Sequence, residues 1–461
     1  MITTGSWMEH LRGVLSEVGG DGTGVDRRRV RPGVNTYIVP SFDRTALQFS
    51  LPVRVERDLV TTGKGTAGLD GVAAVAIEAI KEAARDPSAT DLDPLAGRGT
   101  GFPDRYTAPV EPYTLIASPS AIGVGLFSAG DNNRAVPDGF ELTVTGALPP
   151  ADADDPGAVR VVAGRLDRFV RAIGEVVQGL SDPVLCAGRT ASLDQKGLRR
   201  ALPSLGLVSF VGDGTLPARE YTRHRCHYRV AGPRRDSHIA FRCPAGLAPI
   251  EIELPASGEG ITGLGLSRGE VFAIAGSNAE GKSTLLSAIL SGVDDHLPGD
   301  GRERVVTVPG GVFAEAGTGI HHAADLSLFF DHLPTSLRGT PGSASGPGSG
   351  STSMAEEMVR AVRRQVPILA FDEDRSAVNL LVPSCLSAPG VVPLSTLLAT
   401  RRECLGTTTI LFTAGALDLL TAEADRILVL EGFHAKAMDR SKFRERLVAS
   451  LRPVLERLSG S

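Results

Sequence analysis

The sequence predicts an α/β fold for the C-terminal half of the chain and an α+β domain for the N-terminal half. From about Leu247 onward, strand-like and helix-like segments alternate, which is typical of a mostly parallel sheet flanked by helices. Between Val159 and Leu180, apolar residues recur at three- and four-residue steps, as on the buried face of a long amphipathic helix. The 461 residues are enough for two or three domains with cores of their own.

The expected elements follow from local patterns of apolar, glycine and proline residues. In the N-terminal half we expect helices at 71–85 and 159–180 and strands at 113–117, 140–145 and 206–211, and we expect a further strand at 250–254, just after the C-terminal half begins. In the C-terminal half we expect strands at 270–275, 368–371, 408–412 and 426–430 and helices at 282–291 and 394–404. We divide the chain into a partly disordered N-terminal α+β region (1–96), an accessory or substrate domain (97–246) and a C-terminal domain (247–461).

Composition excludes several classes of protein. The hydrophobic fraction of 42% and the charged fraction of 22% are ordinary for a globular chain and exclude disorder throughout. A formal net charge of −5 argues against a uniformly basic nucleic-acid or membrane-surface protein. The sequence shows no leader-like start and no run of 18 uncharged apolar residues, so we expect a cytoplasmic protein without a membrane partner.

The strongest motif is GSNAEGKS at residues 276–283, which fits the Walker A pattern G-x-x-x-x-G-K-[ST]. It lies between an expected strand and an expected helix, which is the context that a phosphate-binding P-loop requires. We expect nucleotide contacts from Gly276, Ser277, Asn278, Ala279, Glu280, Gly281, Lys282, Ser283 and Thr284. Backbone N–H groups of the loop would face the phosphates, Lys282 would reach the β- and γ-phosphates, and Ser283 would offer its hydroxyl to Mg²⁺.

A second acidic motif follows the apolar segment 368–371. Asp372 comes directly after this segment and is the expected second Mg²⁺ ligand beside Ser283. Glu373 is placed to orient or deprotonate the water that attacks the γ-phosphate. The sequence therefore predicts ATP and Mg²⁺ as cofactors, with Lys282 and Glu373 as catalytic residues.

Taken together, these motifs resemble the ATP-binding-cassette (ABC) class of P-loop NTPases. GSGST at 348–352 stands where that class has its signature loop, and 374–379 resembles the D-loop that follows the catalytic glutamate. The chain looks closer still to predicted ATPases of the ABC class that lack transmembrane domains. The match is strong over 247–432 and makes 247–461 an ABC-type ATPase domain with its signature loop at 348–353.

The resemblance implies a second nucleotide contact at the signature loop. Ser349, Gly350, Ser351 and Thr352 would bind the γ-phosphate of ATP held by another subunit. Because the chain has one P-loop and one signature loop, two copies would meet head to tail as a homodimer around two ATP molecules. The alternative is that 339–353, which is rich in glycine and serine, is only a flexible linker, and we expect 339–347 to be mobile in either case.

Two features of the ABC class are missing. No histidine follows the segment TTILF, where the chain has Thr413-Ala414-Gly415-Ala416. Between Lys282 and Asp372 the only glutamine is Gln365, inside an expected helix, so no Q-loop glutamine is identifiable. We therefore expect slow hydrolysis of ATP to ADP and phosphate.

The basic residues of the N-terminal half gather in one segment. Residues 219–242 contain seven arginines against two acidic residues, with Tyr221, Tyr228 and Phe241 among them. Arginine forks suit phosphates and aromatic rings stack on unpaired bases, so this segment resembles a contact site for single-stranded RNA or DNA. The residues expected to make this contact are Arg223, Arg225, Tyr228, Arg229, Arg234 and Arg235. The alternative is a solvated basic surface, or an arm that neutralises the acidic C-terminal half.

The leading functional prediction is an ABC-class ATPase that couples ATP binding and hydrolysis at a dimer interface to movement of its N-terminal domains around a ligand such as RNA. One alternative is a nucleotide-gated binding module with little turnover, which the missing histidine favours. Another is an ATP-dependent enzyme of small-molecule biosynthesis, since a P-loop also suits phosphoryl transfer. The signature-like and D-loop-like segments argue against the last of these.

Overall fold

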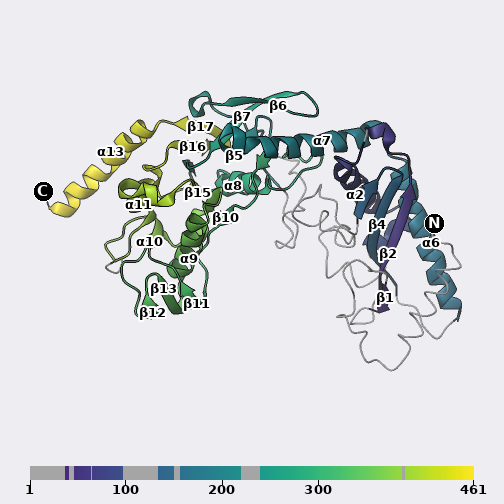
Figure 1. The fold of residues 1–461 in the computed structure, drawn as a ribbon, viewed down its shortest axis with the longest axis horizontal. Helices are drawn as coiled ribbons and strands as arrows, with labels where there is room; N and C mark the ends of the chain where they lie inside the picture. Colours follow the sequence, from purple (N-terminus) through teal and green to yellow (C-terminus); the bar gives the residue numbers. More distant parts are fainter. Residues whose placement is uncertain are drawn as a thin grey trace. The chain divides into compact units, whose positions relative to one another are not determined.

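The structure is a computed structural model that describes residues 37–40, 46–63, 65–96, 133–149, 156–219, 239–386 and 390–460. It contains two compact units, shown in Figure 1. The first ends at Lys196 and also includes Asp294–Asp300, and the second begins at Gly197. These units do not coincide with the ranges 1–96, 97–246 and 247–461. Strands on both sides of residue 246 pair in one sheet, and elements on both sides of residue 96 share one core.

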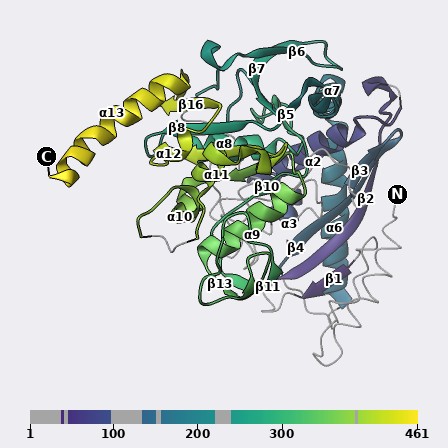
Figure 2. The ribbon, with the colours of Figure 1, turned by 60° about the vertical axis from the view of Figure 1, so that its left-hand side comes forward.

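The first unit is an antiparallel sheet with helices packed on one face, as Figure 2 shows. The strand order is β1-β2-β4-β3, and the strands are β1 (Tyr37–Pro40), β2 (Leu47–Glu56), β3 (Asn133–Val136) and β4 (Gly139–Leu148). The helices are α2 (Leu69–Arg85), α3 (Asp93–Ala96) and α6 (Pro156–Gln178). Alternate residues of β4, including Phe140, Leu142 and Val144, are buried against these helices, as the period of two in a strand requires. The expected helices at 71–85 and 159–180 and the strand at 140–145 are thus present, whereas 113–117 lies outside the described residues.

The second unit is built on a six-stranded sheet of order β10-β14-β15-β8-β16-β17 (Figure 1). Its strands are β8 (Val271–Gly276), β10 (Val312–Phe313), β14 (Ile368–Phe371), β15 (Thr409–Ala414), β16 (Arg426–Glu431) and β17 (His434–Met438). All neighbours are parallel except β16 and β17. β14 and β15 are buried along their whole length, because strands of a parallel sheet are covered on both faces. This is the mostly parallel sheet that the sequence predicts.

A four-stranded antiparallel sheet accompanies the parallel one. Its order is β6-β7-β5-β9, with β5 (Leu207–Gly212), β6 (Ile250–Glu253), β7 (Gly260–Ser267) and β9 (Val305–Thr307). The expected strands at 206–211 and 250–254 both belong to it. α7 (Asp182–Ala201) precedes β5 and continues from the first unit into the second.

The glycine- and serine-rich segment is not a linker, which corrects the expectation that 339–347 is mobile. It forms β12 (Arg338–Thr340) and β13 (Ser343–Gly348), and β13 also pairs with β11 (Gly319–Ala324). Gly339 has a φ of +100°, and a Cβ there would lie 2.3 Å from the Ser343 carbonyl oxygen. Glycine is therefore used here for close strand pairing rather than for flexibility.

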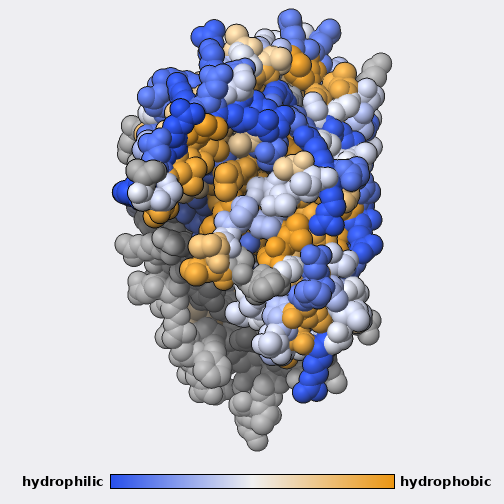
Figure 3. All heavy atoms as spheres, turned by 90° about the vertical axis from the view of Figure 1, so that its left-hand side faces the viewer, coloured by the Kyte–Doolittle hydropathy of each residue, from blue (hydrophilic) through white to orange (hydrophobic). Residues whose placement is uncertain are grey.

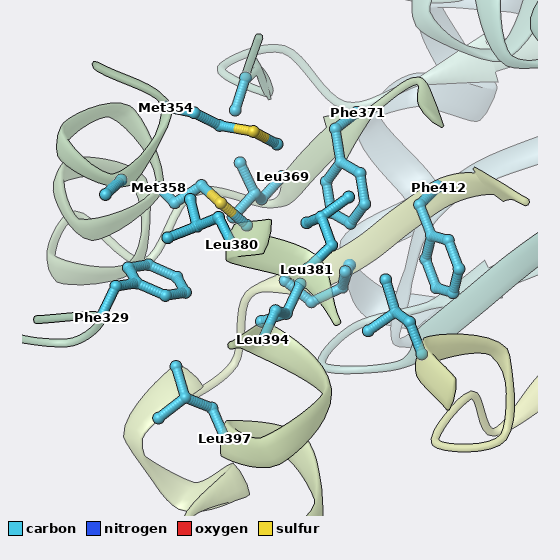
Figure 4. Packing of buried hydrophobic residues seen from close by; sticks show 14 of the residues in the cluster. Phe329, Met354, Met358, Leu369, Phe371, Leu380, Leu381, Leu394, Leu397 and Phe412 are labelled. Atoms are coloured by element: carbon cyan, nitrogen blue, oxygen red, sulfur yellow. The ribbon is translucent and has the colours of Figure 1, made fainter. Parts of the chain in front are cut away.

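The core of the second unit packs the helix that follows β13 against the parallel sheet. Figure 4 shows Met354 and Met358 of α9 (Gly350–Arg363) beside Leu369 and Phe371 of β14. Phe371 stacks on Phe412 of β15, with ring centroids 5.4 Å apart. The remaining helices of this unit are α8 (Lys282–Ser291), α10 (Val378–Leu381), α11 (Leu394–Thr400), α12 (Asp418–Thr421) and α13 (Arg440–Ser459). The helix expected at 394–404 is α11 followed by a 3₁₀ turn, Arg402–Leu405.

The last helix contributes no buried residue to this core. Val448, Leu451, Leu455 and Leu458 of α13 are between 41% and 75% exposed. Figure 3, which views the molecule from the side where α13 lies in Figure 1, shows apolar residues at the surface among hydrophilic ones.

In the part of the chain that the structure describes, every helix is too short or too polar to span a bilayer.

Candidate nucleotide-binding site

The carboxyl ends of four parallel strands bring the predicted motifs to one edge of the sheet. Phe412 of β15 is opposite Phe371 of β14 and Ala273 of β8, and β16 flanks β8 on its other side. Asp372 follows β14 and Gly276 ends β8, so both lie at the same edge. The carboxyl ends of the strands in an open parallel sheet are the usual place for a ligand site.

The P-loop backbone depends on its glycines. Gly276 has a φ of +146°, and a Cβ there would lie 2.6 Å from the Leu430 carbonyl oxygen of the neighbouring strand. Gly281, which caps the N-terminus of α8, has a φ of +89°. Ala279 also takes a left-handed φ of +64°, which is strained for a residue with a side chain. The loop therefore turns sharply between β8 and α8 and leaves the N-terminus of α8 open to an anion.

Lys282 folds back over this loop. Its Nζ donates hydrogen bonds to the carbonyl oxygens of Gly276 and Ser277, both at 2.8 Å. Ser277, Asn278 and Ser283 are exposed. The ammonium group is thus held at the loop where phosphate oxygens would replace these carbonyl acceptors.

A buried threonine joins the two acidic residues. The hydroxyl of Thr413, at the end of β15, donates to Asp372 Oδ1 and accepts the N–H of Glu373, both at 3.0 Å. Thr413 is 0% exposed and Asp372 is 7% exposed, so the network is shielded from solvent. Asp372 also accepts a hydrogen bond from the N–H of Asp374 at 3.3 Å. One hydroxyl therefore links the Asp372 carboxylate to the backbone of Glu373.

The carboxylate of Glu373 contacts the segment after β15, where the resemblance to the ABC class leads us to expect a histidine. It accepts hydrogen bonds from the backbone N–H groups of Gly415 and Ala416, the latter at 3.0 Å. A Cβ on Gly415 would lie 3.2 Å from Glu373 Oε2, 3.4 Å from Lys282 Nζ and 3.5 Å from Asn278 Oδ1. The P-loop lysine and the predicted catalytic glutamate therefore converge around a glycine that leaves room for both.

Sequence reasoning did not identify Thr413, Gly415 and Ala416 as site residues. The sequence does contain a signal for these residues, because small residues directly follow the buried strand that neighbours the P-loop strand. Their role could be recognised only once β15 was placed between β14 and β8.

The signature-like segment forms the start of α9. Ser349 is the N-cap, its hydroxyl accepts the N–H of Thr352 at 3.4 Å, and its own N–H donates to Thr352 Oγ1 at 2.8 Å. Ser351 Oγ donates to Asn379 Oδ1 at 2.9 Å, which connects this segment to the D-loop-like residues. Within the described residues, no hydrogen bond or ion pair joins 349–352 to the P-loop. The P-loop, Asp372 and Glu373 are therefore brought together in one chain, and the signature-like residues are not.

Two other sequence predictions concern Gln365 and the arginine-rich segment. Gln365 bonds through its side chain to the Thr407 N–H at 2.7 Å and to the Val362 carbonyl, so it belongs to a structural turn. The expected nucleic-acid contacts, Arg223, Arg225, Tyr228, Arg229, Arg234 and Arg235, lie outside the described residues.

This site geometry agrees with the comparison to known families. A family model for the ABC_ATPase P-loop domain matches residues 184–453, more than half of the chain. The chain belongs to the ABC_ATPase family. The predicted resemblance to ABC-class ATPases and the predicted P-loop NTPase fold of the C-terminal half are thereby confirmed.

One relative of this ABC_ATPase is an uncharacterized protein, MJ1628, of Methanocaldococcus jannaschii. The two are 39% identical over 357 residues, which is 77% of each chain. Among solved structures, CbiO1 from Clostridium perfringens, part of an ABC transporter complex, is 19% identical, with a TM-score of 0.30 over 42% of this chain and 88% of that one. A bacterial Atm1-family ABC exporter with ATP bound is 13% identical, with a TM-score of 0.29 over 63% of this chain and 50% of that one.

Proposed function

We propose that this ABC_ATPase hydrolyses ATP to ADP and phosphate in a head-to-tail homodimer, and that the nucleotide cycle moves the first unit around a ligand. The observation that carries the proposal is the convergence of Lys282, Glu373 and Asn278 around Gly415. Lys282 and Asn278 follow β8 and Glu373 follows β14, and a lysine and a water-orienting carboxylate are groups that phosphoryl transfer to water requires.

The donor set at the sheet edge fits a bound Mg²⁺. The described residues contain no cluster of three or more His, Cys, Asp or Glu side chains suited to a metal. Mg²⁺ in nucleotide sites is commonly bound by one or two protein oxygens together with phosphate oxygens, and it keeps several waters. Ser283, exposed at the start of α8, and the buried Asp372 would hold it. When bound, Mg²⁺ would neutralise charge on the β- and γ-phosphates.

The protein residues bind the phosphates, orient the attacking water and support the acidic side chains. Lys282 binds the β- and γ-phosphate oxygens, and the P-loop N–H groups with the N-terminus of α8 bind the others. Glu373 orients the attacking water and accepts its proton. Thr413 supports both acidic residues, because its hydroxyl donates to the Asp372 carboxylate and accepts the Glu373 backbone N–H.

The chain has one P-loop and one signature-like segment, which supports a two-fold dimer in which each ATP contacts both copies. Ser349, Gly350, Ser351 and Thr352 of one copy would then bind the γ-phosphate held by the other. Ser349 caps a helix of 14 residues, and such an N-terminus favours an anion.

Coupling to the first unit is supported by the segment that follows the P-loop helix. Soon after α8 ends at Ser291, Asp294–Asp300 joins the first unit. There the Gln195 side chain makes two hydrogen bonds with the backbone of His296, at 2.7 and 2.8 Å. Lys196 forms an ion pair with the buried Asp295 at 2.6 Å. A shift of α8 on nucleotide binding would therefore be passed along the chain to the first unit.

The proposed ligand is single-stranded RNA or DNA, and the support for it is the arginine-rich segment 219–242. Titration with short oligonucleotides at low salt tests it. Binding should weaken when Arg223, Arg225 and Arg229 are changed to Ala, and its salt dependence should become shallower. Absence of binding, or binding that ignores these substitutions, would exclude a nucleic-acid ligand at this segment.

A nucleotide-gated binding module with little turnover is the second candidate. It is favoured by the two backbone N–H groups that already bind the Glu373 carboxylate and by the lack of a histidine after β15. Purified wild type and Glu373→Gln, compared for ATP turnover and for mass with and without ATP, separate the candidates. Measurable wild-type turnover with ATP-dependent dimers supports the ATPase, whereas dimers without turnover support the module.

A further inference from the structure

A buried histidine lies directly behind the signature-like segment. His321 of β11 is 3% exposed, and its ring lies between two residues of α9. Its Nδ1 is 2.6 Å from Glu356 Oε2, and its Nε2 is 2.9 Å from Thr352 Oγ1. Gly348 permits this approach, because a Cβ there would lie 2.6 Å from His321 Nε2.

The hydrogen bonds form a chain that ends at the helix cap. A carboxylate accepts hydrogen bonds, so Nδ1 would donate to Glu356, and in the tautomer with its single proton on Nδ1 the ring accepts the Thr352 hydroxyl proton at Nε2. The lone pairs of Thr352 Oγ1 are then directed to the Ser349 N–H, 2.8 Å away. The Thr352 hydroxyl can also donate to the Ser349 carbonyl oxygen, 3.1 Å away, and acceptance of its proton by His321 Nε2 excludes that alternative. The histidine thus selects one orientation of the cap.

We propose that His321, held by Glu356, is a positioning residue for the signature-like segment. It fixes the Ser349 hydroxyl and the N–H groups of 350–352 in the arrangement that binds the γ-phosphate of ATP held by a second copy. This rests on the proposed dimer. His321 does not touch the nucleotide; it acts through Thr352, as supporting residues do when they hold a binding group in its productive geometry.

The positioning role separates two measurements that a merely structural role would change together. The P-loop of the same copy binds ATP without the signature-like segment, so the ATP affinity of the monomer should not depend on His321. ATP-driven dimerisation uses that segment and should depend on it. We expect His321→Leu, made in the Glu373→Gln background, to weaken ATP-driven dimerisation about tenfold, as for the loss of one buried hydrogen-bond partner. Monomer affinity for a fluorescent ATP analogue should stay within about twofold.

His322 provides a matched control, because it follows His321 on the same strand but is exposed. His322→Leu should change neither measurement, and His321→Gln, whose amide oxygen can accept the Thr352 hydroxyl, should recover part of the dimerisation. If His321→Leu does not fold, Glu356→Leu decides the question, since it removes the carboxylate that holds the imidazole and leaves residues 349–352 unchanged.

Dimerisation of His321→Leu, or of Glu356→Leu, equal to that of the parent would overturn the proposal. Equal losses in monomer ATP affinity and in dimerisation would overturn it too, because they indicate a general structural role. A parent that fails to dimerise with ATP would instead refute the proposed function, and this inference with it. That failure is visible in the parent before any His321 variant is compared.

Discussion

Removing the hydroxyl of Thr413 is the sharpest test of how this site holds its acidic residues. Thr413→Val keeps the shape of the fully buried side chain but removes a donor to Asp372 and an acceptor for the Glu373 N–H. Each lost hydrogen bond costs about 1 kcal/mol, and leaving a buried partner unpaired costs about 1–3 kcal/mol more. If about 2 kcal/mol of this energy would otherwise stabilise the transition state by positioning Glu373, its loss should lower kcat about 30-fold.

The assay is steady-state ATP turnover beside nucleotide affinity and thermal unfolding. Thr413→Ser is the matched control, because it keeps the hydroxyl and should retain most of the activity. We expect KM to change less than kcat, since the P-loop contacts are untouched. A Thr413→Val variant that turns over ATP within about twofold of Thr413→Ser would refute the role given to this hydroxyl.

Three further predictions concern the rest of the second unit. Gly276→Ala should lower both ATP binding and the melting temperature, because its Cβ would meet a carbonyl oxygen at 2.6 Å, whereas Gly317→Ala, with open space around it, should change neither. Burial raises the pKa of the Cys243 thiol to about 11, so at pH 8 an alkylating reagent should modify the exposed Cys385 much faster, as peptide mass spectrometry would show. Removal of 448–461, whose described residues are all exposed, should shift the melting temperature by less than about 2 °C, and a larger drop would mean that this part of α13 packs on the core.

The local part of the site could be predicted from sequence because its signals are local. The P-loop pattern depends on a fixed spacing of glycines, lysine and serine between a strand and a helix, and α8 begins at Lys282 as expected. Asp372 could be placed at a strand end because the apolar run 368–371 has no polar interruption. The parallel sheet followed from the alternation of such runs with helices.

What could not be predicted depends on contacts between distant residues. Thr413 meets Asp372 across 41 positions, and His321 meets Thr352 across 31. Neither pair has a spacing that a local pattern could reveal. The glycine- and serine-rich segment was misleading for a related reason, since its composition is that of a linker and its strand pairing comes from β11. The same holds for Asp294–Asp300, which joins the first unit through Gln195 and Lys196.

The solution mass of Glu373→Gln decides whether the protein forms an ATP-dependent head-to-tail dimer. Without nucleotide the variant should have the mass of one 48.2 kDa chain, and with ATP and Mg²⁺ it should have twice that mass. Adding Ser349→Glu, which places a negative charge where the γ-phosphate would bind, should abolish the dimer without weakening ATP binding to the monomer. A single-chain mass under all nucleotide conditions would exclude the head-to-tail dimer.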